Sequence, residues 1–210
     1  HDRGGELMLQ GELVGHYRKT GNRDGAFKAA KEALRLVDAL DMADALSAGT
    51  TYINVATAYQ AFGESEQALP LFEKAKAVYE ANNASPELVG GLYNNMALTL
   101  SALGRYDEAL ALFHRAFDVM GTVQNGALEQ AMTNLNIADA IVAKCGSEAA
   151  EHELEALLDQ AFDLLNRADL PHDGYYAFVC EKCAPCFSYY GYFAAANTLA
   201  LRAKEIYERA

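Results

Sequence analysis

The triplet Asn-x-Ala occurs three times in this chain, as Asn54-Val55-Ala56, Asn95-Met96-Ala97 and Asn136-Ile137-Ala138. Each copy begins 41 residues after the previous one. A period that is kept twice indicates a repeated structural unit, in which each copy packs mainly on its neighbours. The period therefore decides the fold before any single motif is considered.

Other columns keep nearly the same period when the sequence is aligned on the triplet. Glycines fall between the halves of the units, at Gly21, Gly63, Gly104, Gly146 (one place late) and Gly191. A second column contains only alanine, at Ala33, Ala75, Ala116, Ala161 and Ala203. The sequence therefore predicts five units of about 41 residues that fill nearly the whole chain.

Each unit is predicted to contain two helices. The small and large apolar residues before the glycine recur with helical spacing at Tyr52, Val55, Ala56 and Tyr59. Those after it repeat this spacing at Ala68, Leu71, Phe72 and Ala75. Since glycine adopts a positive φ without steric cost, Gly63 fits the residue just past the end of the first helix. One such hairpin cannot bury its apolar face alone, whereas stacked hairpins can.

The unit resembles the tetratricopeptide repeat (TPR). The segment Gly104-Arg105-Tyr106-Asp107-Glu108-Ala109-Leu110, followed by Phe113 and Ala116, is similar to that family's pattern in the turn and second helix. The period is longer than the family's usual value of about 34 residues. Together with Tyr93-Asn94-Asn95-Met96-Ala97 and Ala68-Leu69-Pro70-Leu71-Phe72, it resembles the kinesin light chain subtype. The resemblance implies an all-α, right-handed α-solenoid of five TPR-like helical hairpins.

We predict a single solenoid domain over residues 1–210, because each repeat contacts only its neighbours and leaves no boundary. The approximate repeats are 7–40, 49–82, 90–121, 131–167 and 177–209. The fourth unit carries four extra residues around Cys145 to His152. We expect them in the turn between its two helices, since insertions in solenoids fall in loops.

The composition argues against two classes of partner. A formal net charge of −12 argues against nucleic acid, which binds to basic surfaces. No apolar run reaches the roughly 18 residues that a membrane helix needs, and the N-terminus does not resemble a signal peptide. We therefore expect no membrane partner and a cytoplasmic location. The carboxylates either solvate the outer face or steer basic and neutral peptides toward the chain.

The resemblance implies that the first helices line a concave surface, where Asn54, Asn95 and Asn136 occupy the same inward place. An amide both donates and accepts, so a ladder of amides can pair with the N–H and C=O groups of an extended peptide. In kinesin light chains the matching asparagines line the cargo groove, which is the role that the resemblance implies here. The alternative is a hydrogen bond to the adjacent repeat that fixes the superhelix, and the two roles are compatible.

The predicted peptide-binding residues are polar and lie on this inward stripe: Asn54, Thr57, Gln60, Asn94, Asn95, Ser101, Asn136, Asp139 and Lys182. In the flanking repeats, Glu12, Arg18, Lys19 and Glu181 lie on the same stripe. Chaperone-binding relatives carry a lysine and an asparagine where this chain has Gly11 and Gly15. Recognition of an acidic chaperone tail is therefore not expected, although Arg18 and Lys19 are candidates for contacting an acidic group on another ligand.

The cysteines Cys180, Cys183 and Cys186 superficially resemble a metal or iron–sulfur run. A fourth ligand is missing, because Cys145 lies far upstream and His172 is eight residues away. The repeat register places the three where small or apolar core residues belong, and buried free cysteine packs as a small hydrophobe. We predict core packing and no metal, with metal binding or redox chemistry as the alternatives.

The proline between two of these cysteines, Pro185, is predicted to kink its helix. Two interpretations remain open. The fifth repeat has drifted as terminal repeats do, or the kink widens the groove at that end.

No catalytic constellation, phosphate-binding loop or metalloprotease motif is present, so we predict neither an enzyme nor a cofactor. We predict a scaffold that binds a peptide segment of a partner protein in its concave groove. One alternative is the ligand-sensing domain of a peptide-responsive regulator, since bacterial pheromone receptors resemble this fold. Another is a structural module that forms homo-oligomers through its terminal repeats.

Overall fold

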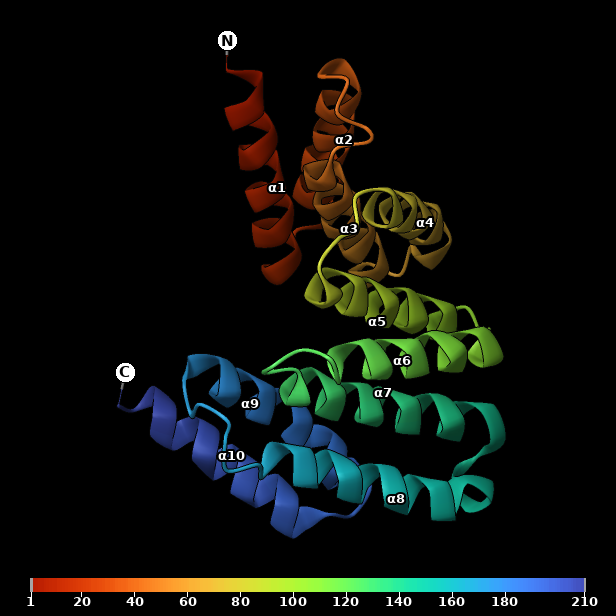
Figure 1. The fold of residues 1–210 in the computed structure, drawn as a ribbon, viewed down its shortest axis with the longest axis vertical. Helices are drawn as coiled ribbons and strands as arrows, with labels where there is room; N and C mark the ends of the chain where they lie inside the picture. The colour runs from red at the N-terminus through yellow and green to blue at the C-terminus, as the bar shows by residue number, and fades with distance from the viewer. Residues whose placement is uncertain (1, 210) are drawn as a thin grey trace. The chain divides into compact units, whose positions relative to one another are not determined.

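The computed structural model describes residues 2–209, and within that range it contains α-helices and no strand (Figure 1). The first five helices are α1 (Arg3–Lys19), α2 (Arg23–Ala39), α3 (Leu46–Ala61), α4 (Ser65–Ala81) and α5 (Pro86–Ala102). The second five are α6 (Tyr106–Met120), α7 (Ala127–Cys145), α8 (Ser147–Leu165), α9 (Gly174–Tyr189) and α10 (Phe193–Tyr207). None of the helices between residues 2 and 209 combines the length and the apolar composition of a membrane-spanning segment.

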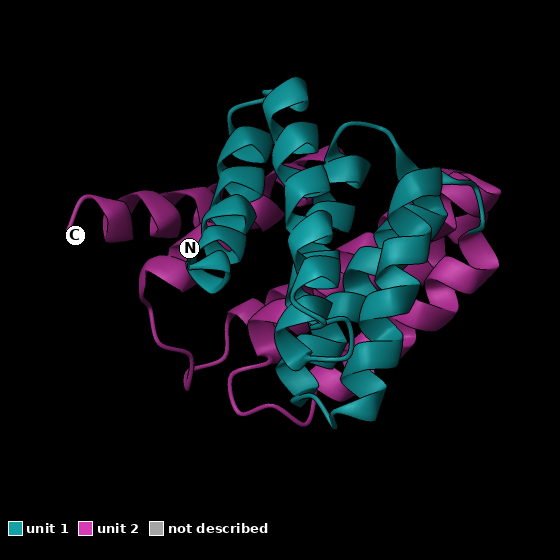
Figure 2. Cartoon of the chain, turned by 90° about the horizontal axis from the view of Figure 1, so that it is seen from above, with its two compact units in different colours: residues 1–105 teal, residues 106–210 magenta. Residues whose placement is uncertain are grey.

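The chain divides into two compact units, residues 1–105 and residues 106–210 (Figure 2). Unit 1 contains the packed pairs α1/α2 and α3/α4, followed by α5. Unit 2 contains α6, followed by the packed pairs α7/α8 and α9/α10. The boundary falls between α5 and α6, so the third predicted repeat is shared between the units. The prediction of one domain over residues 1–210 stays a prediction.

The first helix of each pair begins three or four residues before the predicted start of its repeat. The extra turn is stabilised by a side-chain cap in two of these helices. Asp2 accepts a hydrogen bond from the Gly5 N–H at 2.9 Å, and Asp173 accepts from the N–H groups of Tyr175 and Tyr176. Because the repeat period is counted from core positions, it does not register an exposed, capped first turn.

The turn glycines have the backbone conformation that the sequence predicts. Their φ values are positive, at Gly21 (70°), Gly63 (80°), Gly104 (73°), Gly146 (85°) and Gly191 (85°). At the end of α3, the Gly63 N–H donates to the Gln60 carbonyl at 3.0 Å, and the Glu64 N–H donates to the Tyr59 carbonyl at 2.9 Å. This pair of bonds satisfies carbonyls at the helix end and requires the left-handed residue that glycine supplies.

The extra residues of the fourth unit do not form a turn, so that expectation is wrong. Only Gly146 lies between α7 and α8, and these helices contain 19 residues each. By comparison, α9 contains 16 residues and α10 contains 15. The segment after Gly146 is rich in alanine and glutamate, which favour helix. The insertion has therefore lengthened both helices of this pair.

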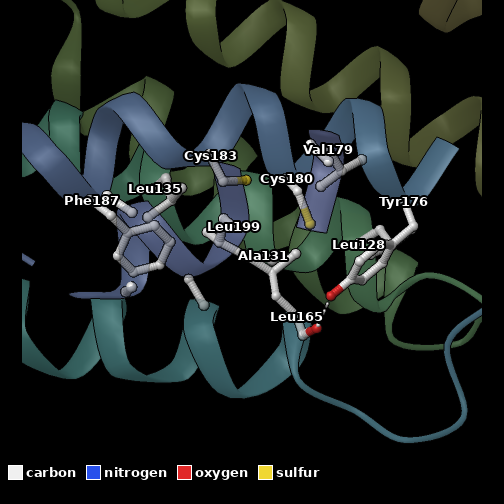
Figure 3. Packing of buried hydrophobic residues seen from close by; sticks show 14 of the residues in the cluster. Leu128, Ala131, Leu135, Leu165, Tyr176, Val179, Cys180, Cys183, Phe187 and Leu199 are labelled. Carbon is white, nitrogen blue, oxygen red and sulfur yellow. Dashed lines mark hydrogen bonds between the residues drawn. The ribbon is translucent and has the colours of Figure 1, made fainter. Parts of the chain in front are cut away.

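The cores of the two units contain both small and large buried residues. All five members of the alanine column are buried. In unit 2, side chains from α7, α8, α9 and α10 meet in one cluster that includes Leu128, Leu165, Phe187 and Leu199 (Figure 3). The buried phenol of Tyr176 donates to the Leu165 carbonyl at 3.0 Å, so its polar end is satisfied inside the cluster.

Candidate functional site

A cavity of about 710 Å³ lies in unit 1 between α1, α3 and α5, which are the first helices of successive repeats. Contacts of α3 with both α1 and α5 place these helices side by side. The lining residues are Gly11, Glu12, Gly15, His16, Arg18, Lys19, Ile53, Asn54, Thr57 and Asn95. Three of them, Asn54, Thr57 and Asn95, belong to the predicted peptide-binding set.

One wall of this cavity is helix backbone without side chains. Gly11 and Gly15 lie one turn apart on α1, and a Cβ atom built at either position would meet no atom within 4 Å. Space beside the backbone is therefore open over one turn of α1. A ligand can approach the helix there more closely than any other residue would allow.

Two amide side chains reach the same cavity from α3 and α5. Asn54 is exposed and Asn95 is half-buried, and neither side chain makes a hydrogen bond within residues 2–209. The alternative role, in which the asparagine side chain links one repeat to the next, requires a hydrogen bond of this kind. The structure therefore gives no support to that role for Asn54 and Asn95. Each amide therefore retains its donor and acceptor for a ligand.

Positive charge gathers at the C-terminal end of α1. Arg18 and Lys19 line the cavity beside His16, and Glu12 is the one carboxylate among the lining residues. In the described part of the chain, neither Arg18 nor Lys19 has an ion-pair partner. Cations at this end of a helix also interact favourably with its dipole. The cavity thus has a local positive charge in a strongly acidic chain.

Other predicted residues of unit 1 do not line the cavity. Gln60, Asn94 and Ser101 are half-buried and lie outside it. The Ser101 hydroxyl oxygen is buried without a hydrogen-bond partner. Sequence reasoning gave no binding role to Gly11 and Gly15, which it noted only as departures from the chaperone-binding relatives, and it did not single out His16. The spacing of four residues between Gly11 and Gly15, which places both on one face of α1, was the signal that could have grouped these two.

The predicted residues of unit 2 have different surroundings. Asn136 is half-buried on α7, whereas Asp139 is exposed and accepts a hydrogen bond from the Tyr190 hydroxyl at 2.7 Å. Lys182 is exposed on α9, with its Nζ 5.6 Å from the centre of the Phe178 ring. A ligand that binds Asp139 must therefore compete with a phenol from the same unit. Sequence reasoning missed Tyr190, which lies 51 residues from its partner.

The cysteines occupy the places predicted for core residues. Cys180 and Cys183 are buried in the cluster of Figure 3, and Cys186 packs against it half-buried. Core packing is therefore confirmed for the first two. Cys145, at the end of α7, is exposed. Between residues 2 and 209, no three His, Cys, Asp or Glu side chains are arranged to hold a metal ion.

Pro185 lies within α9, which continues past it to Tyr189. It lines a cavity of about 660 Å³ between α9 and α10, together with Ala184, Ala200 and other residues of both helices. The hypothesis that this proline widens a peptide groove stays a prediction.

Burial of the thiols predicts an alkaline loss of stability. Burial raises the pKa of Cys180 and Cys183, and burial together with Asp139 raises the pKa of Cys186 to about 12 from 9.0. The thiols of the unfolded chain ionise at lower pH than the buried thiols of the folded chain. The contribution of the neutral buried thiols to the free energy of unfolding is therefore complete below pH 9 and is lost as the pH rises from about 9 toward 12. Urea denaturation at pH 8 and pH 10.5 should show this fall. The fall should become smaller in Cys186→Ala and stay unchanged in Cys145→Ala, and equal behaviour of the two variants would contradict the prediction.

Two sequence models described as tetratricopeptide repeat match the chain, one over residues 6–81 and the other over residues 89–122. Together they cover more than half of the 210 residues. No curated protein matches the sequence significantly.

Solved structures with a similar fold align over nearly the whole chain. A putative kinesin light chain from Podosopora anserina, with nearly identical TPR-like repeats, has 18% identity and a TM-score of 0.67 over 97% of this chain and 95% of its own. BtubC (BKLC) from P. vanneervenii has 14% identity and a TM-score of 0.51, covering 100% and 92%. A Rap protein complexed with Competence and Sporulation Factor has 15% identity and a TM-score of 0.56, covering 100% and 65%.

Identities this low establish the fold alone. The similar fold of these structures agrees with the helix pairs, the turn glycines and the buried alanine column of this chain. The predicted all-α solenoid of TPR-like hairpins is confirmed, as is its similarity to kinesin light chain-like repeats. This chain belongs to the tetratricopeptide repeat family.

Proposed function

We propose that this chain is a non-enzymatic scaffold that binds an extended segment of a partner protein in the cavity of unit 1. Tetratricopeptide repeats generally mediate interactions between proteins. A Rap protein of similar fold, solved in complex with Competence and Sporulation Factor, is a precedent for a ligand-bound form. The proposal assigns the binding role here to α1, α3 and α5.

The observation that carries the proposal is the pairing of a bare helix wall with two unoccupied amides. The open backbone at Gly11 and Gly15 leaves room for a second backbone. Asn54 and Asn95 line the same space and can pair with the alternating N–H and C=O groups of an extended segment. Contacts to backbone groups give affinity without a strict sequence requirement, so specificity must come from other side chains.

The positively charged side chains of α1 supply part of this specificity. Arg18 and Lys19, with His16 beside them, favour a segment that places an acidic side chain or a C-terminal carboxylate at this end of the cavity. The net charge of the chain is −12, so long-range attraction of acidic segments is not expected. Selection for acidity would therefore act at short range, inside the cavity.

The remaining predicted residues extend the proposal to further contacts with the same partner. These residues are Gln60, Asn94, Ser101, Asn136, Asp139 and Lys182. Self-association is a separate proposal, supported by exposed apolar side chains in α9 and α10, among them Tyr189, Phe193 and Leu201. We propose a cytoplasmic location for the scaffold.

Replacing Asn54 and Asn95 together with alanine tests the proposed contacts. Peptides selected from a random display library on the immobilised wild-type chain supply the ligand. We expect the double variant to bind them about 30-fold more weakly, because two amide groups lose hydrogen bonds worth about 1 kcal/mol each. Fluorescence anisotropy with a labelled peptide measures the affinity.

The matched control is Gln67→Ala, which removes an exposed amide from the second helix α4. It should bind like the wild type, and the helical circular dichroism of all three proteins should be the same. If the double variant retains the wild-type affinity for every selected peptide, the two asparagines have no role in binding.

A further inference from the structure

A second cavity, of about 840 Å³, lies in unit 2 between the first turns of α8 and the turn that joins α9 to α10. Its origin is the insertion in the fourth unit. Since α8 has three or four more residues than α9 or α10, it is about 5 Å longer than either. The lining residues from the α9–α10 side all come from the end of α9 and the turn after it.

The face that α8 presents to this cavity has an apolar floor and an acidic rim. Leu154 and Leu158 form the floor, the first half-buried and the second fully buried. Glu148, Glu151 and Glu155 line the cavity and are exposed. These five residues recur at helical spacing, so they lie along one side of α8.

The opposite side is aromatic. Tyr189, Tyr190 and Tyr192 line it, and the rings of Tyr189 and Tyr190 meet edge to face, with centroids 4.9 Å apart and planes at 80°. The hydroxyl of Tyr190 donates to Asp139, which holds that ring in place. Two rings at right angles form a corner, and the face of an aromatic ring attracts cations.

The charge of the cavity is not balanced by the protein. No lysine or arginine is among its lining residues. Glu148, Glu151 and Glu155 have no ion-pair partner in the part of the chain that the structure describes. Burial, and then the negative charges of Asp159 and Glu155, raise the pKa of Tyr192. The aromatic side of the cavity therefore lies beside negative charge that no basic side chain of the lining balances.

We propose that this cavity binds an organic cation with at least two ammonium or guanidinium groups. Along the axis of α8, Glu148 and Glu151 are separated by roughly 4.5 Å, and Glu151 and Glu155 by roughly 6 Å. Positive groups joined by short aliphatic chains match this spacing, and the chains pack on Leu154 and Leu158. The Tyr189–Tyr190 corner accepts one of the cationic groups.

Two sources carry this chemistry, a free linear polyamine and the basic side chains of a protein segment. The probes are spermidine and the blocked peptide acetyl-Arg-Gly-Arg-amide. Each is titrated into the whole chain by isothermal calorimetry, while the tyrosine ring resonances are followed by nuclear magnetic resonance. Saturable binding with shifts at Tyr189 and Tyr190 is the expected result. Tighter binding of spermidine assigns the site to free polyamines, and tighter binding of the peptide assigns it to a basic segment.

Variants separate the cavity from the general acidity of the chain. Glu151→Gln combined with Glu155→Gln should weaken binding about tenfold, and Tyr189→Leu about threefold. The matched control combines Glu153→Gln with Asp163→Asn, which removes the same two charges from exposed positions on α8 outside the cavity and should change affinity less than about twofold. Tyr189 is 77% exposed, so its replacement does not disturb the core.

The proposal is overturned if neither probe saturates, if the tyrosine resonances do not shift, or if the control pair at Glu153 and Asp163 weakens binding as much as the variant pair at Glu151 and Glu155. Equal effects would mean that the probes respond only to the net charge of −12. This cavity lies in unit 2 and the proposed peptide cavity in unit 1, so either proposal can fail without the other.

Discussion

Replacing Gly15 with leucine is expected to weaken peptide binding at least about 100-fold while leaving the fold intact or more stable. The space beside Gly15 is open, so a leucine side chain enters the cavity of unit 1 without meeting other atoms near its Cβ. It then occupies the volume that the proposed ligand backbone needs. Leucine is also favoured over glycine inside a helix by about 0.5–1 kcal/mol, so α1 should gain stability.

The opposite signs of these two effects make the result decisive. A residue with only a structural role cannot lose binding while it gains stability. The control is Gly174→Leu, at another helical position with open space but in α9. Fluorescence anisotropy with a selected peptide and urea denaturation measure both quantities. If the Gly15 variant binds as tightly as the wild type, the peptide does not lie against α1.

Replacing Phe187 with alanine is expected to lower the free energy of unfolding of unit 2 by about 4 kcal/mol. Phe187 is fully buried and packs edge to face against Phe162, with ring centroids 5.9 Å apart. Its removal leaves a void in the cluster where α7, α8, α9 and α10 meet (Figure 3). Interiors packed as densely as crystals do not close such a void fully.

Hydrogen exchange of amides in α9 and α10, together with urea denaturation, measures this loss. The matched control is Phe193→Ala, since Phe193 is 64% exposed in the same helical pair. Its effect should stay within about 0.5 kcal/mol. A similar loss from both variants would show that the cluster of Figure 3 does not hold this pair together.

The two proposed sites differ in chemistry because different features formed them. The unit 1 cavity depends on missing side chains at Gly11 and Gly15 and ends in basic residues. The unit 2 cavity depends on added residues in α8 and is acidic and aromatic. Under the two proposals, one chain would select an acidic segment at one site and a cation at the other.

Much of the fold was predictable because it depends on local spacing. The positive φ of Gly63 and the burial of Ala75 follow from their places in a period, since the same environment recurs in each repeat. The core role of Cys180 and Cys183 followed from the same register. For the candidate site, the predicted inward stripe included Asn54, Thr57 and Asn95, which line one cavity in the structure; their role in binding stays a prediction.

Sequence alone thus determined the helix pairs, the glycines that end their first helices and the buried alanine column, because these depend on neighbours at fixed separations. Only the tertiary structure decided which polar groups are already occupied. The Tyr190 hydroxyl takes up an oxygen of Asp139 across 51 residues, and no periodic pattern records that pair. It also decided that the insertion after Gly146 continues as helix and leaves a cavity beside it. Such features depend on how helices of unequal length pack, which a repeat period does not contain.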